Sequence, residues 1–192
     1  MTSQAFQSSF SDAERCIAQF REDDIAQQSL VGLANRLADV YSSGGKVLVA
    51  GNGGSMADAM HFAEEWTGRF RNDRRPFPAL AMSDPTHLTC VANDHGYDYV
   101  FSRIVTAFAK PEDMVVLIST SGNSQNLVNA AEAATASGAH VTGFLGRGGG
   151  RLASLCDTVI MAPGETSDRI QEIHMLALHV LIEVVEGLLG FT

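Results

Sequence analysis

The sequence contains little cysteine and no long apolar run. Its three cysteines, Cys16, Cys90 and Cys156, are far apart and odd in number, so they form neither a disulfide framework nor a CxxC motif. No stretch approaches the roughly 20 apolar residues of a transmembrane helix, and the first residues lack the pattern of a signal peptide. We therefore expect a cytoplasmic protein with reduced cysteines and no membrane association.

Positive charge is also scarce. Thirteen Lys and Arg residues stand against 22 Asp and Glu residues, which gives a net charge of −9. Such a charge opposes binding to nucleic acid, so an anionic ligand would need a local site. The one basic cluster, RFRNDRRP at residues 69–76, is compatible with a solvated loop, a subunit contact or a substrate clamp.

Apolar periodicity predicts the elements of the fold. Residues 1–43 predict two amphipathic helices, the first with a possible cap or break at Ser11 or Asp12, and their apolar faces must be buried on the sheet or on another subunit. Further along the chain, strands and helices alternate. The expected strands are residues 46–50, 79–82, 114–119, 140–145 and 158–161. The expected helices are residues 55–69, 85–93, 99–109, 125–137, 150–155 and 167–189.

The expected strands are continuous apolar runs, which is typical of a parallel sheet covered on both faces. Repeated strand–helix units of this kind predict an α/β fold, a three-layer doubly wound parallel five-stranded sheet. Residues 1–43 would form an N-terminal helical extension that makes oligomer contacts. Residues 44–192 would form the α/β unit, in a single structural domain overall.

The segment VLVAGNGGSMADAMHFAEE, residues 47–65, combines a strand, a glycine-rich loop and a helix start. Free backbone N–H groups and the helix dipole make such a junction an anion site. The segment matches neither a P-loop nor GxGxxG, which disfavours nucleotides. His61 and Glu65 lie four residues apart on one helix face, as in half of a metal or acid–base site.

A second polar loop, STSGNS at residues 119–124, joins the third strand to a helix. It is compatible with a simple helix cap. Its hydroxyls also suit phosphate oxygens, and ligands of open α/β sheets bind at such strand ends. Two loops of this kind favour a small sugar phosphate.

The last helix is apolar except for a few polar residues, among them Gln171, His174 and His179. Gln171 and His179 are about 80° apart around the helix axis and can lean to one side, whereas His174 and His179 are about 140° apart and cannot easily reach one metal. A histidine on such a helix is also compatible with a core or interface role.

The motifs GNGGS, DAMHFAEE, TGRF, AND (residues 92–94), STSGNS and RIQEIH, with His179 beyond them, resemble the sugar isomerase (SIS) domain family over nearly the whole chain. Within it, they are most similar to the branch that isomerises sedoheptulose 7-phosphate to D-glycero-D-manno-heptose 7-phosphate through an enediol. The resemblance implies a flavodoxin-like sheet and homotetramers with shared active sites. It also implies the first step of ADP- or GDP-heptose precursor synthesis for lipopolysaccharide or surface glycans.

The resemblance also implies residue roles. Glu65 and His179 would be the acid–base pair. One zinc ion per subunit would be bound by His61, Glu65, Gln171 and His179. The substrate would be bound by Asn52, Gly53, Gly54, Ser55, Glu65, Asn93, Asp94, Ser119, Thr120, Ser121, Ser124 and Gln171. Two departures from the family pattern, Trp66 in place of Leu and Leu145 in place of a polar residue, would change packing near the site and one pocket wall.

Other interpretations involve the same fold. One is a non-catalytic SIS-domain protein that binds the DnaA replication initiator, and another is a sugar-phosphate-sensing module of a regulator. Such DnaA partners lack the carboxylate and the histidine that this chain has at Glu65 and His179, which favours the enzyme. A third interpretation is an isomerase of a different sugar phosphate, such as a pentose phosphate.

Overall fold

The computed structural model describes residues 2–191, and a five-stranded parallel sheet lies at its centre. The strands are β1 (Val47–Gly51), β2 (Ala79–Ala81), β3 (Met114–Ser119), β4 (His140–Leu145) and β5 (Thr158–Met161). Their order is β2-β1-β3-β4-β5, and each adjacent pair is parallel. This is the flavodoxin-like order of a doubly wound sheet, as expected from the sequence.

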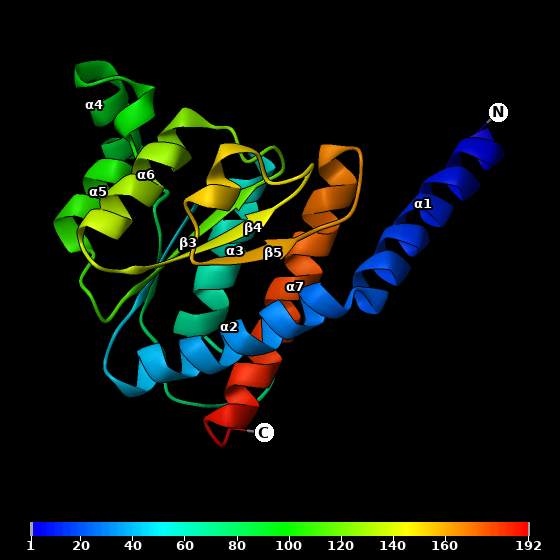
Figure 1. Cartoon of the computed structure of the whole chain (residues 1–192), viewed down its shortest axis with the longest axis horizontal. Coiled ribbons are helices and arrows are strands. Elements are labelled where there is room, and N and C mark those ends of the chain that lie inside the picture. Colours follow the sequence, from blue (N-terminus) through cyan, green and yellow to red (C-terminus); the bar gives the residue numbers. More distant parts are fainter. Residues whose placement is uncertain (1, 192) are drawn as a thin grey trace.

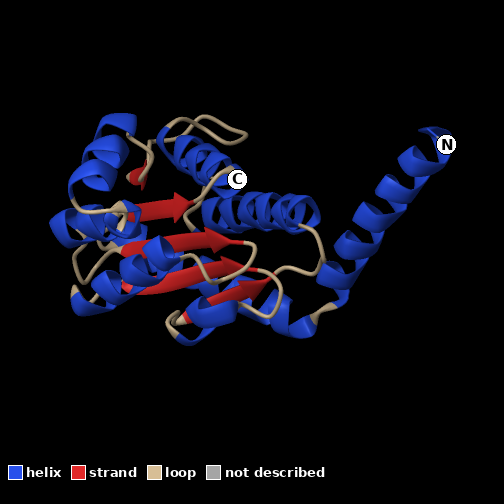
Figure 2. Ribbon diagram, turned by 90° about the horizontal axis from the view of Figure 1, so that it is seen from above, coloured by secondary structure: helices blue, strands red, loops and turns tan. Residues whose placement is uncertain are grey.

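Helices cover both faces of the sheet (Figures 1 and 2). They are α1 (Thr2–Glu22), α2 (Asp24–Ser42), α3 (Gly54–Thr67), α4 (Pro85–Asp94), α5 (Ser102–Phe108), α6 (Gln125–Ala136) and α7 (Ser167–Leu188), with the 3₁₀ turns η1 (Tyr97–Tyr99) and η2 (Gly150–Ser154). Helices α2, α3 and α7 pack on one face, and α5 and α6 pack on the other.

Successive residues of the central strands belong to opposite faces. Val47 and Val49 of β1 belong to the core under α2, α3 and α7. Leu48 and Ala50 belong to the core under α5 and α6. All five residues of β1 are buried, so the uniform apolar runs in the sequence reflect a sheet that is covered twice.

The helix boundaries differ from expectation in three places. Helix α1 runs unbroken through Ser11 and Asp12, and the break comes at Asp23, whose side chain caps α2. The helix expected over residues 99–109 is divided into η1 and α5. The segment after residue 150 is a 3₁₀ turn of five residues, since a segment so short favours the tighter winding.

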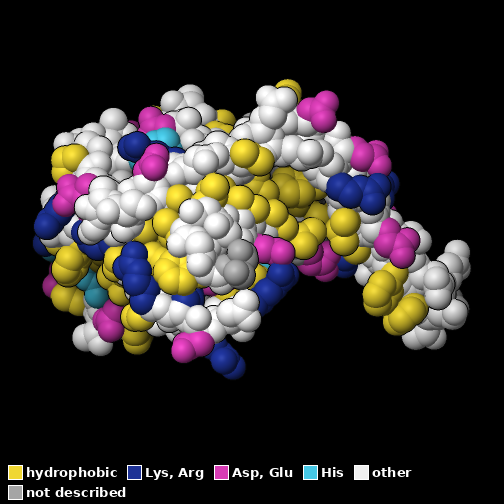
Figure 3. Space-filling model, turned by 90° about the horizontal axis from the view of Figure 1, so that it is seen from below, with side chains coloured by type: hydrophobic (Ala, Val, Ile, Leu, Met, Phe, Trp, Pro, Cys, Tyr) yellow, Lys and Arg dark blue, Asp and Glu magenta, His cyan; other side chains and the backbone are white. Residues whose placement is uncertain are grey.

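Helix α1 extends away from the body of the molecule (Figure 1). Of its described residues, Cys16 is the buried one, and Phe6, Phe10 and Ile17 are exposed. An apolar hollow between α1, α2 and α7 is lined in part by Phe20 and Val180, and hydrophobic side chains gather beside the projecting helix in Figure 3. None of the helices described is both long and apolar enough to cross a membrane.

Candidate functional site

A polar pocket of about 210 Å³ lies at the carboxyl ends of β1 and β3. Its walls come from the two loops singled out in the sequence and from the start of α7. The lining residues are Asn52, Ser55, Ile118, Ser119, Thr120, Ser121, Ser124, Leu127, Ser167 and Gln171. Strands β1 and β3 are neighbours although β2 separates them in sequence, so the pocket lies where the strand order reverses, the usual ligand position in such sheets.

Three helices begin at this pocket. Ser55 lies in the first turn of α3, Ser124 is the N-cap residue of α6, and Ser167 is the first residue of α7. Helix N-termini offer free N–H groups and a partial positive charge to an anion. Among the described residues that line the pocket there is no Lys or Arg, so hydroxyls and N–H groups would hold a phosphate there.

Close approach of two loops shapes the second motif. The hydroxyl of Ser119 accepts a hydrogen bond from the Gly122 N–H at 3.0 Å. Gly122 has a φ of +64°, and a Cβ at this position would lie 1.8 Å from the carbonyl oxygen of Gly149. The sequence therefore needs glycine here for both its backbone conformation and its contact with the loop after β4.

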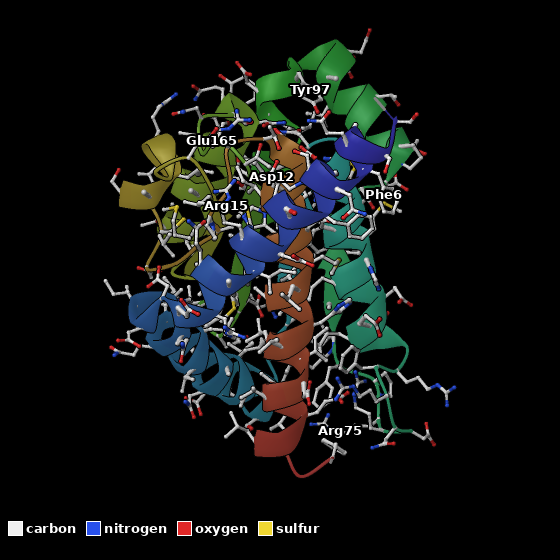
Figure 4. All side chains as sticks on the ribbon, turned by 90° about the vertical axis from the view of Figure 1, so that its right-hand side faces the viewer. Phe6, Asp12, Arg15, Arg75, Tyr97 and Glu165 are labelled. Atoms are coloured by element: carbon white, nitrogen blue, oxygen red, sulfur yellow. The ribbon has the colours of Figure 1, made fainter. Side chains whose placement is uncertain are left out.

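The side chain of Asn52 is fixed by two residues that the sequence did not single out. Its Nδ2 donates to Asn126 Oδ1 at 3.0 Å, and its Oδ1 accepts from Asn126 Nδ2 at 2.9 Å. The same Oδ1 accepts from the Tyr97 hydroxyl at 2.8 Å. Asn126 and Tyr97 come from α6 and η1, so only the tertiary fold reveals their role. Tyr97 is labelled at the end of the molecule where α7 begins (Figure 4).

A second group of side chains lies further along α3 and α7. One nitrogen of His61, one nitrogen of His179 and one carboxylate oxygen of Glu65 all lie within 4.8 Å of one another. His61 Nε2 is 3.1 Å from Glu65 Oε1, and the rings of His61 and His179 meet edge to face with centroids 5.1 Å apart. His61 is 43% exposed and Glu65 is 14% exposed. Two imidazoles and a carboxylate are typical zinc ligands, and three protein ligands leave a coordination position open.

Gln171, the fourth expected zinc ligand, contacts the first turn of α3. Gln171 Nε2 lies 3.4 Å from the Ser55 hydroxyl, and a Cβ on Gly54 would lie 2.6 Å from the same nitrogen. His179 is eight residues further along α7, about 12 Å away along the axis. Within one chain, Gln171 lines the pocket, and its role as a zinc ligand stays a prediction.

The other expected substrate residues divide between the pocket and its surroundings. Asn93 and Asp94 lie exposed at the end of α4 and do not line the pocket, and Asn93 Nδ2 donates to Asp94 Oδ1 at 2.7 Å. This bond lowers the pKa of Asp94. Gly53, the N-cap residue of α3, has a φ of +59°. It is not among the lining residues either.

The two departures from the family pattern lie in the core. Leu145 is fully buried beneath α6 and does not line the pocket, so the expectation that it reshapes a pocket wall is wrong. Trp66 is fully buried one residue after Glu65, and its ring contacts Tyr41, Phe62 and Phe77. It therefore fills the core beneath the C-terminal end of α3, and the expected change of packing relative to Leu stays a prediction.

Two titratable groups on the site helices, one half-buried and one fully buried, have shifted pKa values. Asp58 is one helical turn before His61, and burial raises the pKa of its carboxyl to about 6, against the opposing effect of His61. His174 lies inside α7 with its ring edge against Phe144, and burial lowers its pKa to about 4. Both groups therefore favour their neutral forms.

The flavodoxin-like strand order and the hydroxyl-lined anion pocket define a SIS domain protein, and the model of the SIS domain family matches residues 10–146. A phosphoheptose isomerase of Fusobacterium nucleatum subsp. nucleatum is 48% identical over 182 residues, which cover 95% of this chain and 94% of that protein. One of Pectobacterium atrosepticum is 48% identical over 93% of both chains. The chain belongs to the phosphoheptose isomerase family.

Solved structures agree with this assignment. The phosphoheptose isomerase of Neisseria gonorrhoeae superposes with a TM-score of 0.91 at 34% identity, covering 97% of this chain and 100% of that one. That of Francisella tularensis gives a TM-score of 0.93 at 28% identity, with 97% and 99% covered. The strand order, the N-terminal helices and the last helix are therefore features of the family fold.

Proposed function

We propose that this enzyme converts sedoheptulose 7-phosphate to D-glycero-D-manno-heptose 7-phosphate. The observation that carries the proposal is the pairing of two sites on α3 and α7. The N-terminal ends of these helices border an anion pocket, and Glu65 and His179 meet further along the same two helices. A phosphate pocket joined to an acid–base pair suits the isomerisation of a sugar phosphate.

The reaction moves a proton between the first two carbons of the sugar through an enediol. The Glu65 carboxylate would take the carbon-bound proton and return it to the neighbouring carbon. His179, whose ring lies against that of His61, would move the proton between the two substrate oxygens. Asn52, held by Asn126 and Tyr97, would orient the bound sugar.

We also propose that His61, Glu65 and His179 hold one zinc ion per subunit. The donor set fits this metal, and the three ligand atoms all lie within 4.8 Å of one another. Bound zinc would supply positive charge that polarises the substrate oxygens. The same charge weakens a bound carboxylate as a base, so Glu65 either leaves the metal during turnover or the metal is structural.

The first test is product analysis after incubation of the purified protein with sedoheptulose 7-phosphate. Glu65→Gln and His179→Gln are each expected to abolish turnover while leaving the circular dichroism spectrum unchanged. Glu64→Gln, on the exposed neighbour of Glu65, is the matched control and should retain activity. Near-normal turnover in either site variant would contradict the assigned roles.

The second test removes the metal. Exhaustive chelation is expected to eliminate activity, and added zinc is expected to restore it, as followed by metal analysis and turnover in parallel. Full activity of the metal-free protein would show that the metal is dispensable. If the metal-free protein is folded but inactive, zinc is needed for turnover and not for folding.

We infer in addition a cytoplasmic homotetramer with shared active sites, acting at the start of heptose-nucleotide synthesis for lipopolysaccharide or surface glycans. The exposed apolar side chains on α1 and α7 support assembly. The presence of both Glu65 and His179 in one cluster disfavours the alternative of a non-catalytic DnaA-binding protein.

A further inference from the structure

The basic cluster at residues 69–76 contains one arginine that is not on the surface. The side chain of Arg74 is 0% exposed, although it belongs to the loop between α3 and β2. Its neighbour Arg75 is labelled near the C-terminal end of α7 in Figure 4. A guanidinium is charged at any ordinary pH, so burying it requires a complete set of partners.

Arg74 has such a set, and its partners lie on both helices of the candidate site. Its Nε donates to Glu186 Oε1 of α7 at 2.5 Å. Its two terminal nitrogens donate to the backbone carbonyl oxygens of Glu65 at 2.7 Å and Trp66 at 2.9 Å. The guanidinium also lies over the rings of Trp66 and Phe77, 5.5 and 5.2 Å from their centroids.

These carbonyl oxygens belong to the last turn of α3, which ends at Thr67. The last four carbonyl groups of a helix have no partner within the helix and carry its partial negative charge. Arg74 satisfies two of them and places its positive charge at the favourable end of the dipole. One of the two belongs to Glu65 itself, so Arg74 contacts the backbone of the residue that carries the carboxylate.

The partner carboxylate fixes the other helix. Glu186 is almost fully buried at 6% side-chain exposure, and it lies about two turns beyond His179 on α7. Arg74 thus links the end of α3 at Glu65 to α7 at a position about two turns beyond His179. At the opposite end, the absence of a side chain at Gly54 allows Gln171 to approach α3.

We propose that the buried Arg74–Glu186 pair is a positioning device that sets the separation of Glu65 and His179. This inference rests on the proposed isomerase function. Neither residue touches the substrate. The pair acts by holding α3 and α7 at the spacing that proton transfer and metal binding require, since a shift of about 1 Å in such a site can cost 100-fold in rate.

The chain contains a matched control. Arg71 Nη1 lies 2.7 Å from Glu183 Oε1 and joins the same loop to the same helix, one turn nearer the start of α7. These side chains are 61% and 50% exposed, and no hydrogen bond joins Arg71 to a carbonyl group of α3 among the described residues. An exposed pair of this kind contributes little, so its loss should not move the helices.

The experiment compares Arg74→Lys and Glu186→Gln with Arg71→Lys and Glu183→Gln in the full chain. For the buried pair, kcat for sedoheptulose 7-phosphate is expected to fall about 10- to 100-fold, while KM changes less than about twofold because the phosphate pocket is distant. Zinc affinity, measured by titration of the metal alone, is expected to fall about 10-fold. Both control variants should match the wild type in all three quantities.

Several results would overturn the inference. One is a folded Arg74→Lys or Glu186→Gln variant whose kcat equals that of the wild type. A loss of thermal stability with unchanged kcat and zinc affinity would reduce the pair to a structural role. If Arg74→Lys does not fold, Glu186→Gln decides alone, because it keeps the side-chain volume and an oxygen acceptor for Nε.

Failure of the proposed function gives a different result. It would appear as an inactive wild type, and zinc titration would then test the pair separately. A crystal structure of Glu186→Gln provides a readout that needs neither activity nor metal. The separation of the His61 and His179 rings is expected to exceed that of the wild type, and an unchanged separation would contradict the inference.

Discussion

His174 is a titratable side chain that the protein holds in its neutral form. It is fully buried in α7, and its pKa of about 4 lies well below the ordinary value of 6.5. A histidine of this kind adds stability that is fully present above pH 6.5 and is lost as the pH falls towards 4. The contribution of Asp58 to stability changes with pH in the opposite direction. Its raised pKa of about 6 gives stability that is present in acid and is lost as the pH rises through about 6.

We predict that His174→Phe will flatten the acid limb of the stability curve. Below pH 6.5 the wild type should lose up to about 1.4 kcal/mol of unfolding free energy per pH unit from this group, because the buried ring must gain a charge. Urea titrations at pH 7 and pH 5 would measure the difference. Equal slopes for the two proteins would show that another group controls the acid transition.

At the residue scale, spacing predicts pairs within one element, whereas the pair of Glu65 and His179 on two helices was expected only from the family resemblance. The spacing of His61 and Glu65 gives their shared face directly. Gln171 and His179 share a side of α7, where Gln171 lines the pocket and His179 lies beside His61 and Glu65. Asn126 and Arg74 act through contacts with residues far away in sequence, which spacing cannot reveal.

At the scale of elements, the loop after β3, which lines the pocket, packs directly against the loop after β4. Gly122 contacts the backbone of Gly149 so closely that any side chain would collide with it. The sequence predicted the polar loop at residues 119–124 from its hydroxyls and its position after a strand. It could not predict the loop's contact with the glycines after β4, because that contact depends on β3 and β4 being neighbours.

Gly122→Ala is expected to raise KM for the sugar phosphate at least several-fold and to destabilise the protein by about 1–3 kcal/mol. The displaced loop would misplace the hydroxyls of Ser119 and Ser121. Gly148→Ala is the control, since Gly148 has a φ of +76° but open space around it. Both variants strain the backbone, but only Gly122→Ala brings its methyl group against a neighbouring loop. Thermal unfolding and steady-state kinetics of the two variants therefore distinguish the effect of strain from that of the steric clash. A Gly148→Ala variant as impaired as Gly122→Ala would attribute the effect to strain alone.

The strands were the elements best predicted from sequence, because short apolar runs that alternate with helical segments are typical of buried parallel strands. The boundaries of β3, β4 and β5 agree with expectation. The segment around η1 and α5 was predicted less well. Val100 and Phe101 lie buried between the 3₁₀ turn η1 and helix α5. Tertiary packing of these two residues, and not local periodicity, therefore sets where α5 begins.

At the scale of the whole molecule, α7 presents an apolar stripe to its surroundings. Leu176, Val180, Val184 and Leu188 recur every four residues and are each more than a third exposed. Residues at this spacing share one helix face. A continuous apolar face of this kind is typical of a protein interface, in agreement with the proposed tetramer.

We predict that Val184→Glu will dissociate the assembly and lower activity more than 10-fold, because it would place an unpaired charge in an apolar contact. Light scattering coupled to size-exclusion chromatography would measure the mass. Phe108→Glu, at an exposed apolar residue of α5 on the other face of the sheet, serves as the control. A Val184→Glu protein with the mass and turnover of the wild type would place the subunit contacts elsewhere.

The projecting helix α1 has a consequence for how the protein behaves on dilution. Its 21 residues bury Cys16 and leave Phe6, Phe10 and Ile17 exposed in the single chain. Most of the stability of a helix in a protein comes from the packing of its apolar face. Its order then depends on a second chain. Dilution should therefore separate the subunits and unwind α1. The specific activity is expected to decrease as the protein is diluted, and to return after a lag when the protein is concentrated again.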